Sequence, residues 1–175
     1  MRKVTLMVAN SLDNYIARKD GAGDWILGGE ESASLLTDFW KTIDTVVIGR
    51  KTYEPVLKSG APFPTLPGVR NYVLSRTLKE VSDMNVEIIR EDAAEFVRKL
   101  KTQESERVIA VTGGLLAKPL FEANLIDEVR INIHPILLGS GIPLFHEMSH
   151  QINLELITCK TFKTGCVLVT YRVKY

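Results

Sequence analysis

The sequence predicts an α/β fold in which a mostly parallel sheet is completed by an antiparallel edge near the C-terminus. Up to Ala123, short apolar runs alternate with segments of helical periodicity, which is typical of βα units. Beyond Asn124, apolar and polar residues alternate in consecutive segments, which indicates antiparallel strands. No internal repeat, linker or low-complexity tract divides the 175 residues, so we expect one domain over residues 1–175.

Three strands and two helices are expected in the first half of the chain. The strands cover residues 3–9, 44–49 and 71–75, and the helices cover residues 30–41 and begin again at Arg50. The helix at 30–41 has acids in its first turn, where the helix dipole favours negative charge. Its apolar face consists of Leu35, Leu36, Phe39 and Trp40. Prolines and glycines between Ser59 and Gly68 predict an irregular loop.

The second half begins with βα units and ends in strands. We expect a short strand at 86–89, an amphipathic helix at 92–102, a buried strand at 108–111 and a helix that follows it to residue 123. Three further strands are expected at 128–134, 154–162 and 167–173, with a turn at residues 163–165 before the last one.

Composition excludes several classes of function. Lys and Arg number 22 against 21 Asp and Glu, so a net charge of +1 gives no reason to expect nucleic acid or a membrane surface as a partner. The N-terminus lacks the apolar region of a signal peptide, and we expect a cytoplasmic protein. Cys159 and Cys166 flank the predicted turn without facing each other, so neither a disulfide nor a metal site is expected.

Three strand ends carry groups that suit phosphate. They are Gly49-Arg50-Lys51-Thr52, Ser75-Arg76-Thr77 and Thr112-Gly113-Gly114. Two glycines let the backbone turn tightly and let a ligand approach it, and the first amides of a helix lack internal partners. Cations in a first helical turn oppose the helix dipole unless an anion binds there. Taken singly, each set is equally compatible with an ordinary polar turn or with solvent-facing charge.

Convergence of the three sets is the stronger argument for a site. In an open α/β sheet the carboxyl ends of parallel strands line one crevice, so the three sets are expected to meet there. A ligand with phosphates spread along it, such as a dinucleotide, fits this arrangement better than a single phosphate does.

These residues belong to a larger pattern that resembles the dihydrofolate-reductase-like family. The similarity is greatest to the C-terminal reductase domain of the bifunctional riboflavin-biosynthesis deaminase-reductase and to its free-standing bacterial relatives. The matching segments are ANSLDNYIA at 9–17, DW at 24–25, VIGRKTYE at 47–54, VLSR at 73–76, VTGGLL at 111–116 and HPILLGSGIPLF at 134–145. They occur in the expected order over nearly the whole chain. Asn14 stands where the relatives usually have glycine, and asparagine tolerates a left-handed backbone.

The resemblance implies a three-layer fold with helices on both faces of a twisted sheet, and an NADPH-dependent reductase. It places the cofactor against Ala9, Ile16, Gly49, Arg50, Lys51, Thr52, Leu74, Ser75, Arg76, Thr112, Gly113, Gly114, Leu115 and Leu116. The two arginines would favour NADPH over NADH, because the 2′-phosphate offers them an extra dianion. Ala9 and Ile16 would orient the nicotinamide. Similar domains are often homodimers, so we also expect a homodimer.

The substrate side is less defined. The resemblance places Asp13 and Trp25 there, but Asp13 is as well explained as a turn cap and Trp25 as a packing anchor. Folate reductases hold their substrate with a buried carboxylate on the first helix, and neither Glu30, Glu31 nor Asp38 stands out by its spacing. No catalytic proton donor is assigned.

Three functions therefore remain open. A small nitrogen heterocycle is the expected substrate, with an aminouracil ribosyl phosphate of riboflavin synthesis ahead of dihydrofolate. A module that binds NADPH without turnover is the alternative from another class.

Overall fold

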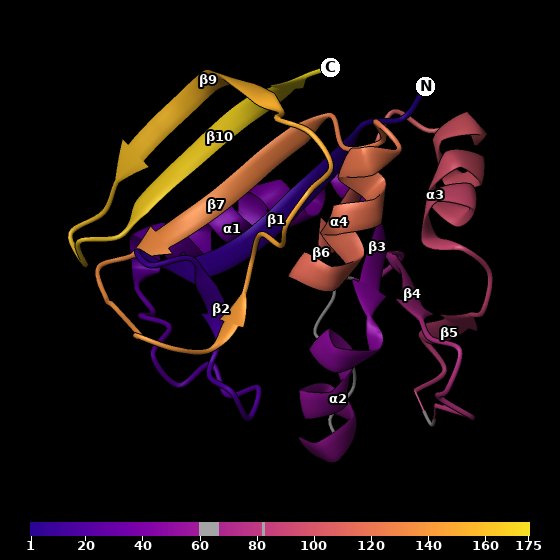
Figure 1. The fold of residues 1–175 in the computed structure, drawn as a ribbon, viewed down its shortest axis with the longest axis horizontal. Coiled ribbons are helices and arrows are strands. Elements are labelled where there is room, and N and C mark those ends of the chain that lie inside the picture. The colour runs from indigo at the N-terminus through magenta and orange to yellow at the C-terminus, as the bar shows by residue number, and fades with distance from the viewer. Residues whose placement is uncertain (60–66, 82) are drawn as a thin grey trace.

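The structure, a computed structural model, describes residues 1–59, 67–81 and 83–175. The chain forms an eight-stranded sheet in the order β5-β4-β3-β6-β1-β7-β10-β9, with four helices around it (Figure 1). The strands of this sheet are β1 (Val4–Ser11), β3 (Ile43–Gly49), β4 (Arg70–Leu74), β5 (Val86–Ile89), β6 (Val108–Thr112), β7 (Glu128–His134), β9 (Asn153–Thr161) and β10 (Val167–Lys174). The helices are α1 (Glu30–Lys41), α2 (Arg50–Ser59), α3 (Ala93–Thr102) and α4 (Gly114–Glu122).

Strand directions confirm the predicted sheet. From β5 to β7 every neighbouring pair is parallel, whereas β10 is antiparallel to both β7 and β9. Each parallel strand therefore ends at the same edge of the sheet, which is the condition for a shared site.

Helices cover both faces of the sheet, as predicted. In Figure 1, α4 lies in front of the sheet and α1 behind it. The core in front joins α3 and α4 to the sheet through residues such as Leu100, Leu120 and Val111. A second core, behind β4, β3 and β6, includes Val46 and packs against Phe39 and Trp40 of α1. The side chains of Leu35 and Leu36 lie outside the described residues, as does most of the predicted loop at 59–68.

Two short strands were not predicted. Strand β2 (Tyr15–Ala17) pairs antiparallel with β8 (Ile142–Pro143), where we expected only turns. Segments of two and three residues carry no readable periodicity, because their pairing is set by the rest of the fold. The ribbon they form brings the loop after β1 against the glycine-rich segment after β7.

Local sequence signals explain how two segments begin and turn. Asp92, expected as the first residue of a helix, is instead its N-cap: its carboxylate accepts from the amides of Ala94 at 2.8 Å and Glu95 at 3.1 Å. Asn14 has a φ of 71°, in the left-handed region that asparagine tolerates.

Both cysteines are free, as predicted, and they differ in burial. Cys159 is exposed on β9 and Cys166 is buried beside β7, whereas the sequence had suggested that both thiols are half-buried. Among the described residues, no helix has the length and apolar character that crossing a membrane requires.

Three large apolar side chains are exposed on the edge strand β9. Leu154, Leu156 and Ile157 are exposed on it, and the strand has one free edge. An exposed apolar edge strand is an open template for pairing with another chain. The predicted homodimer is therefore best placed at this edge, and it stays a prediction.

We expect the wild-type protein to have the mass of a dimer by light scattering, and Leu156→Lys to shift it toward the monomer. A lysine at the edge opposes pairing through charge and lost apolar area. Leu137→Lys makes the same change at an exposed leucine away from β9 and should leave the mass unchanged. A monomeric wild type at micromolar concentration contradicts the prediction.

Candidate functional site

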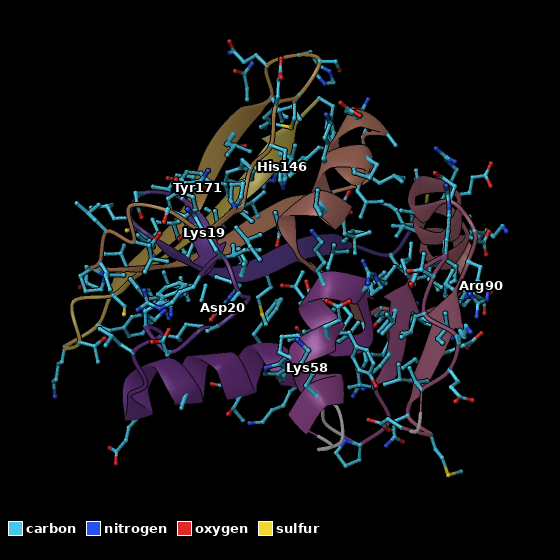
Figure 2. All side chains as sticks on the ribbon, turned by 60° about the horizontal axis from the view of Figure 1, so that its bottom comes forward. Lys19, Asp20, Lys58, Arg90, His146 and Tyr171 are labelled. Carbon is cyan, nitrogen blue, oxygen red and sulfur yellow. The ribbon has the colours of Figure 1, made fainter. Side chains whose placement is uncertain are left out.

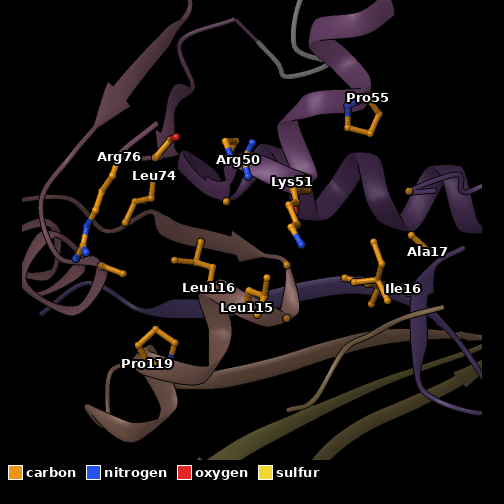
Figure 3. Close-up of a pocket in the computed structure, with 18 of the residues that line it drawn as sticks. Ile16, Ala17, Arg50, Lys51, Pro55, Leu74, Arg76, Leu115, Leu116 and Pro119 are labelled. Atoms are coloured by element: carbon orange, nitrogen blue, oxygen red, sulfur yellow. The ribbon is translucent and has the colours of Figure 1, made fainter. Parts of the chain in front are cut away.

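One cavity of about 610 Å³ lies at the carboxyl ends of β3, β4 and β6. All the predicted cofactor residues except Ala9 and Thr112 line it, so the structure brings the three strand-end sets together (Figure 3). Ala9 and Thr112 are half-buried strand residues that do not line this cavity. Both the general rule for parallel sheets and the family resemblance predicted this convergence, and the geometry agrees with them.

The Gly-Gly turn between β6 and α4 is possible only without side chains. Gly113 has a φ of 105°, and a Cβ built on it would lie 2.7 Å from the Thr52 hydroxyl oxygen. A Cβ on Gly114 would lie 2.3 Å from the carbonyl oxygen of Leu144 and 2.6 Å from that of Pro143. The turn is thus wedged between α2 on one side and the strap at residues 143–144 on the other.

The start of α4 leaves amides available to a ligand. Its N-cap, Gly113, has no side chain to cap the helix, and the first turn contains no acid. Ala117 donates to the Gly113 carbonyl at 3.0 Å, and the amides before it have no partner within the helix. Together with the helix dipole, these amides form a site that suits an anion.

Two cations enter from the first turn of α2, which also lacks an acid. Arg50 is bonded to Glu54 at 2.6 Å in an exposed pair, which is worth little in water. Lys51 points from α2 toward Leu115 at the start of α4 (Figure 3). The charge of the Arg50 guanidinium is thus partly balanced by Glu54 of the same helix. Lys51 instead faces the start of α4 across the cavity.

At the third strand end, Ser75 and Arg76 serve different purposes. Ser75 is buried, and its hydroxyl oxygen accepts from the amides of Thr77 at 3.2 Å and Leu78 at 2.9 Å. Its role in the structure is therefore to hold the turn after β4. Arg76 is exposed beside the cavity and is the group there that can reach a phosphate.

Sequence reasoning missed the acids at the end of β5. Glu91 and Asp92 line the cavity near Arg76. Asp92 is engaged as the cap of α3, and Glu91 is bonded to Lys99 at 2.5 Å. The signal was present, because these residues directly follow a predicted strand, and the rule applied to the other three strand ends also covers this one.

Apolar residues complete the walls. Several of them were not predicted: Ala17, Ile26, Pro55, Ala93, Pro119 and Ile142. Gly21 and Gly23 also line the cavity. Most of these lie in loops or in the short ribbon, where no periodicity marks a residue as part of a site.

A smaller cavity adjoins the first, between the loop after β2 and α2. Lys19 and Asp20 line it from the loop and Lys58 from the helix (Figure 2). Lys51 and Ile142 line both cavities, so the loop and the ribbon form a common wall.

Asp13 caps a turn in the structure. Its carboxylate accepts from the Ser11 hydroxyl at 2.5 Å and from the amides of Leu138 at 3.1 Å and Gly139 at 2.7 Å. The Ser11 hydrogen bond, followed by those amides, lowers the pKa of Asp13. These contacts tie the loop after β1 to the segment after β7. They support the turn-cap alternative over the substrate contact.

Trp25 is buried against His134. The two ring centroids are 5.3 Å apart with the rings perpendicular, and neither residue lines the main cavity. Packing therefore accounts for Trp25, although its indole nitrogen is buried without a partner among the described residues.

The acids of α1 do not form a buried carboxylate, so far as they are described. Glu30 is exposed, and Asp38 is exposed and bonded to Lys41 at 3.0 Å. The side chain of Glu31 lies outside the described residues. Within the described parts of the chain, no cluster of three or more His, Cys, Asp or Glu residues could hold a metal ion.

Comparison with known proteins gives a consistent family. The family model of the RibD C-terminal domain matches residues 2–168. The uncharacterized protein YwjB of Bacillus subtilis (strain 168) is 37% identical over 92% of this chain and 92% of its own length.

Solved structures share the fold. A putative riboflavin biosynthesis protein from Shewanella sp. PV-4 has a TM-score of 0.85 at 27% identity and covers 99% of both chains. Dihydrofolate reductase from Enterococcus faecalis, complexed with NADP(H), has a TM-score of 0.71 at 17% identity over 99% of this chain and 97% of its own. The Thermotoga maritima deaminase and 5-amino-6-(5-phosphoribosylamino)uracil reductase has a TM-score of 0.70 at 18% identity, over 98% of this chain and 56% of its own. The dihydrofolate-reductase-like fold is thereby confirmed.

We expect Gly114→Ala to lower the free energy of unfolding by about 1–3 kcal/mol, because its Cβ would overlap two backbone carbonyls that must move. Urea unfolding followed by circular dichroism measures the change. Gly28→Ala is the matched control, since no atom lies within 4 Å of its added Cβ. Equal stabilities of the two variants would show that the strap at 143–144 yields freely.

Proposed function

The chain belongs to the RibD C-terminal domain family, and from this and its cavity we propose that it is an NADPH-dependent reductase acting on a small nitrogen heterocycle. Family membership, with the Shewanella neighbour, supports a reductase of this family. One observation carries the finer proposal: bare helix amides, Lys51 and Arg76 surround a single cavity at the carboxyl ends of three parallel strands.

The residues present fit a dinucleotide. The amides at Gly114, Leu115 and Leu116 would hold the pyrophosphate, since the first amides of a helix lack partners within it and lie at the positive end of its dipole. Arg50, Lys51, Thr52, Ser75 and Arg76 would surround the phosphates of the adenosine half. In our proposal the nicotinamide lies near Ile16, which lines the same cavity from the β2–β8 ribbon.

NADPH is proposed over NADH on a balance of charges. Arg50 and Arg76 attract a 2′-phosphate, whereas Glu91 and Asp92 at the same end repel it. Both acids are already engaged, one by Lys99 and one by the amides of α3, which weakens the repulsion. Arg50 is likewise paired with Glu54, so the proposed preference for NADPH rests mainly on Arg76.

When bound, the cofactor supplies the hydride, and the protein supplies position and a dry environment. Ile16, Ile26 and Ile142 would form an apolar wall at the proposed nicotinamide end and exclude water from it. The cations and amides at the other end would fix the dinucleotide along the cavity. Because the dinucleotide would be held in this way, the reacting carbon of the substrate could approach the nicotinamide from one direction only.

An aminouracil ribosyl phosphate is the substrate we favour. The Thermotoga enzyme named for this activity shares the fold, and the family is that of the riboflavin reductase domain. Dihydrofolate is the alternative. It needs a buried carboxylate, and neither Glu30 nor Asp38 supplies one. A module that binds NADPH without turnover has no observation that favours it over a reductase.

The decisive test is a titration with NADPH, first alone and then with each heterocycle. We expect NADPH to bind, and its nicotinamide absorbance to fall when the aminouracil ribosyl phosphate is added but not when dihydrofolate is added. Binding without oxidation would favour the binding module. Without any NADPH binding, the proposed function is wrong.

We expect Arg76→Ala to weaken the binding of NADPH about tenfold or more and the binding of NADH by less than about threefold. The reason is that only NADPH carries the 2′-phosphate, so only NADPH loses a charge-assisted hydrogen bond. Fluorescence titration of both dinucleotides measures the two dissociation constants. Arg98→Ala removes an exposed arginine of α3 that does not line the cavity, and serves as the control. Equal losses for both dinucleotides would show that Arg76 does not read the 2′-phosphate.

A further inference from the structure

A line of polar side chains lies under α1, outside the main cavity. Along β7, Val129 and Ile131 face the core in front of the sheet, so the alternating residues Arg130 and Asn132 face the other side. Thr170 of β10 lies directly opposite Arg130 and shares its face. The guanidinium of Arg130 lies 4.6 Å from the ring centroid of Phe39, which places α1 above this face.

Several polar atoms on this face are buried and have no hydrogen-bond partner among the residues that the structure describes. They are Arg130 Nε, Asn132 Oδ1, Thr170 Oγ1 and, where the loop before α1 covers the face, Trp25 Nε1. Thr170 is 7% exposed and Trp25 is 5% exposed, so water does not reach them freely. A buried polar group without a hydrogen bond is costly, and several on one face call for a specific reason. We call Arg130, Asn132, Thr170 and Trp25 the Arg130 stripe.

The charge of Arg130 is not balanced by a carboxylate. Burial lowers the pKa of its guanidinium, the charge of Glu128 acts in the opposite direction, and Glu128 is itself bonded to Lys3 at 2.6 Å. Among the described residues, Arg130 has no ion pair, and its contact with Phe39 stabilises a cation without neutralising it. Arg130 is half-buried, and a partly desolvated cation without an ion pair favours a negatively charged ligand.

The hydrogen bonds of His134 decide which way the Asn132 amide faces. The Leu27 amide donates to His134 Nδ1 at 3.1 Å, so in the neutral ring the proton is on Nε2. Burial lowers the pKa of His134, which favours the neutral ring. Nε2 lies 3.1 Å from the Asn132 amide nitrogen, and two donors cannot bond. The consistent arrangement has the Asn132 oxygen on His134 and the amide NH₂ on the stripe.

With this orientation, every member of the stripe can donate a hydrogen bond. Arg130, the Asn132 NH₂ and the Trp25 indole are donors only, and the Thr170 hydroxyl can donate as well. The edges of pterins and pyrimidinediones contain N–H groups, which would meet donors here. An oxygen-rich anion has acceptors only, so each of its oxygens can accept from a member of the stripe and its charge complements that of Arg130.

The stripe also adjoins Ala9, which the family resemblance places against the nicotinamide although it does not line the main cavity. Ala9, predicted to orient the nicotinamide, is the direct partner of Asn132 across β1 and β7. Residues paired in this way lie about 4.8 Å apart. A substrate whose ring meets the nicotinamide near Ala9 can therefore place an attached group on the stripe.

We propose that the Arg130 stripe binds an oxyanion of the substrate, a phosphate or a carboxylate, and so determines which heterocycles the enzyme accepts. The assignment of the anion to the substrate rests on the proposed function. The inference that the stripe binds an anion depends only on the geometry of the stripe. Arg130 is the residue that contributes most, because it supplies the charge.

The test compares matched probes that differ only in the anion. Ribose 5-phosphate is titrated against ribose, and benzoate against benzamide, by calorimetry, with and without NADPH. We expect at least one anion to bind the wild type about tenfold more tightly than its neutral counterpart. The first pair reports a phosphate and the second a carboxylate. If neither anion binds better than its neutral counterpart, the inference is overturned.

Variants locate the binding on the stripe. Arg130→Met and Asn132→Asp should each reduce anion affinity about tenfold or more, because one removes the charge and the other replaces a donor by a carboxylate oxygen. Arg172→Met is the matched control on β10, where the arginine is exposed and bonded to Glu155 at 3.0 Å. Equal affinities of Arg130→Met and Arg172→Met for the anion would overturn the inference.

Stability provides a readout that separates binding from folding. We expect Arg130→Met to raise the Tm, because it removes a buried cation without a partner. If this variant folds poorly, Thr170→Val can replace it, because valine keeps the side-chain shape of threonine. Thr170→Val should still lower the affinity for the anion severalfold. NADPH affinity is measured in the same samples. Loss of NADPH binding in the wild type overturns the proposed function, while anion binding in the absence of NADPH tests the stripe separately.

Discussion

The close approach of three backbone segments at Gly113 and Gly114 is the constraint on which the site depends. These two positions let β6 turn into α4 while Thr52 of α2 and the carbonyls of residues 143–144 lie against the turn. Any side chain at Gly114 would push the strap away and, with it, the β2–β8 ribbon that forms a wall of the cavity. The amides at the start of α4, the cations of α2 and the apolar wall are therefore positioned by the same contact.

Much of this could be predicted from the sequence, because its strongest signals are local. The helix α1 and the strands β5 and β7 have the predicted bounds, since each has a clear periodicity or a short apolar run between polar residues. The site followed from a general rule: parallel strands end at one edge, so groups at their ends must meet. Ser75 is the instructive case, because the sequence placed it in the cavity but did not show that its hydroxyl already holds the turn.

What could not be predicted depends on contacts between distant segments. The β2–β8 ribbon is too short for any pattern. Trp25, which the resemblance assigned to the substrate, is held by His134 from a strand more than a hundred positions away. The alternation along β7 was predicted correctly. The polar face of such a strand is normally solvated, so nothing in the sequence indicated burial there. Only the structure shows that α1 covers Arg130, and burial is what turns an ordinary arginine into an unbalanced charge.

The face under α1 has two halves, and their contrast bears on function. Beneath β4, β3 and β6 it is apolar and packs against Phe39 and Trp40, whereas beneath β7 and β10 it carries donors without partners. The apolar half is what holds α1 on the sheet, so the polar half lowers stability and needs another explanation. In our two proposals, the positive groups at the strand ends bind the anionic cofactor and those on this face bind an anionic group of the substrate, with Ala9 paired directly to Asn132.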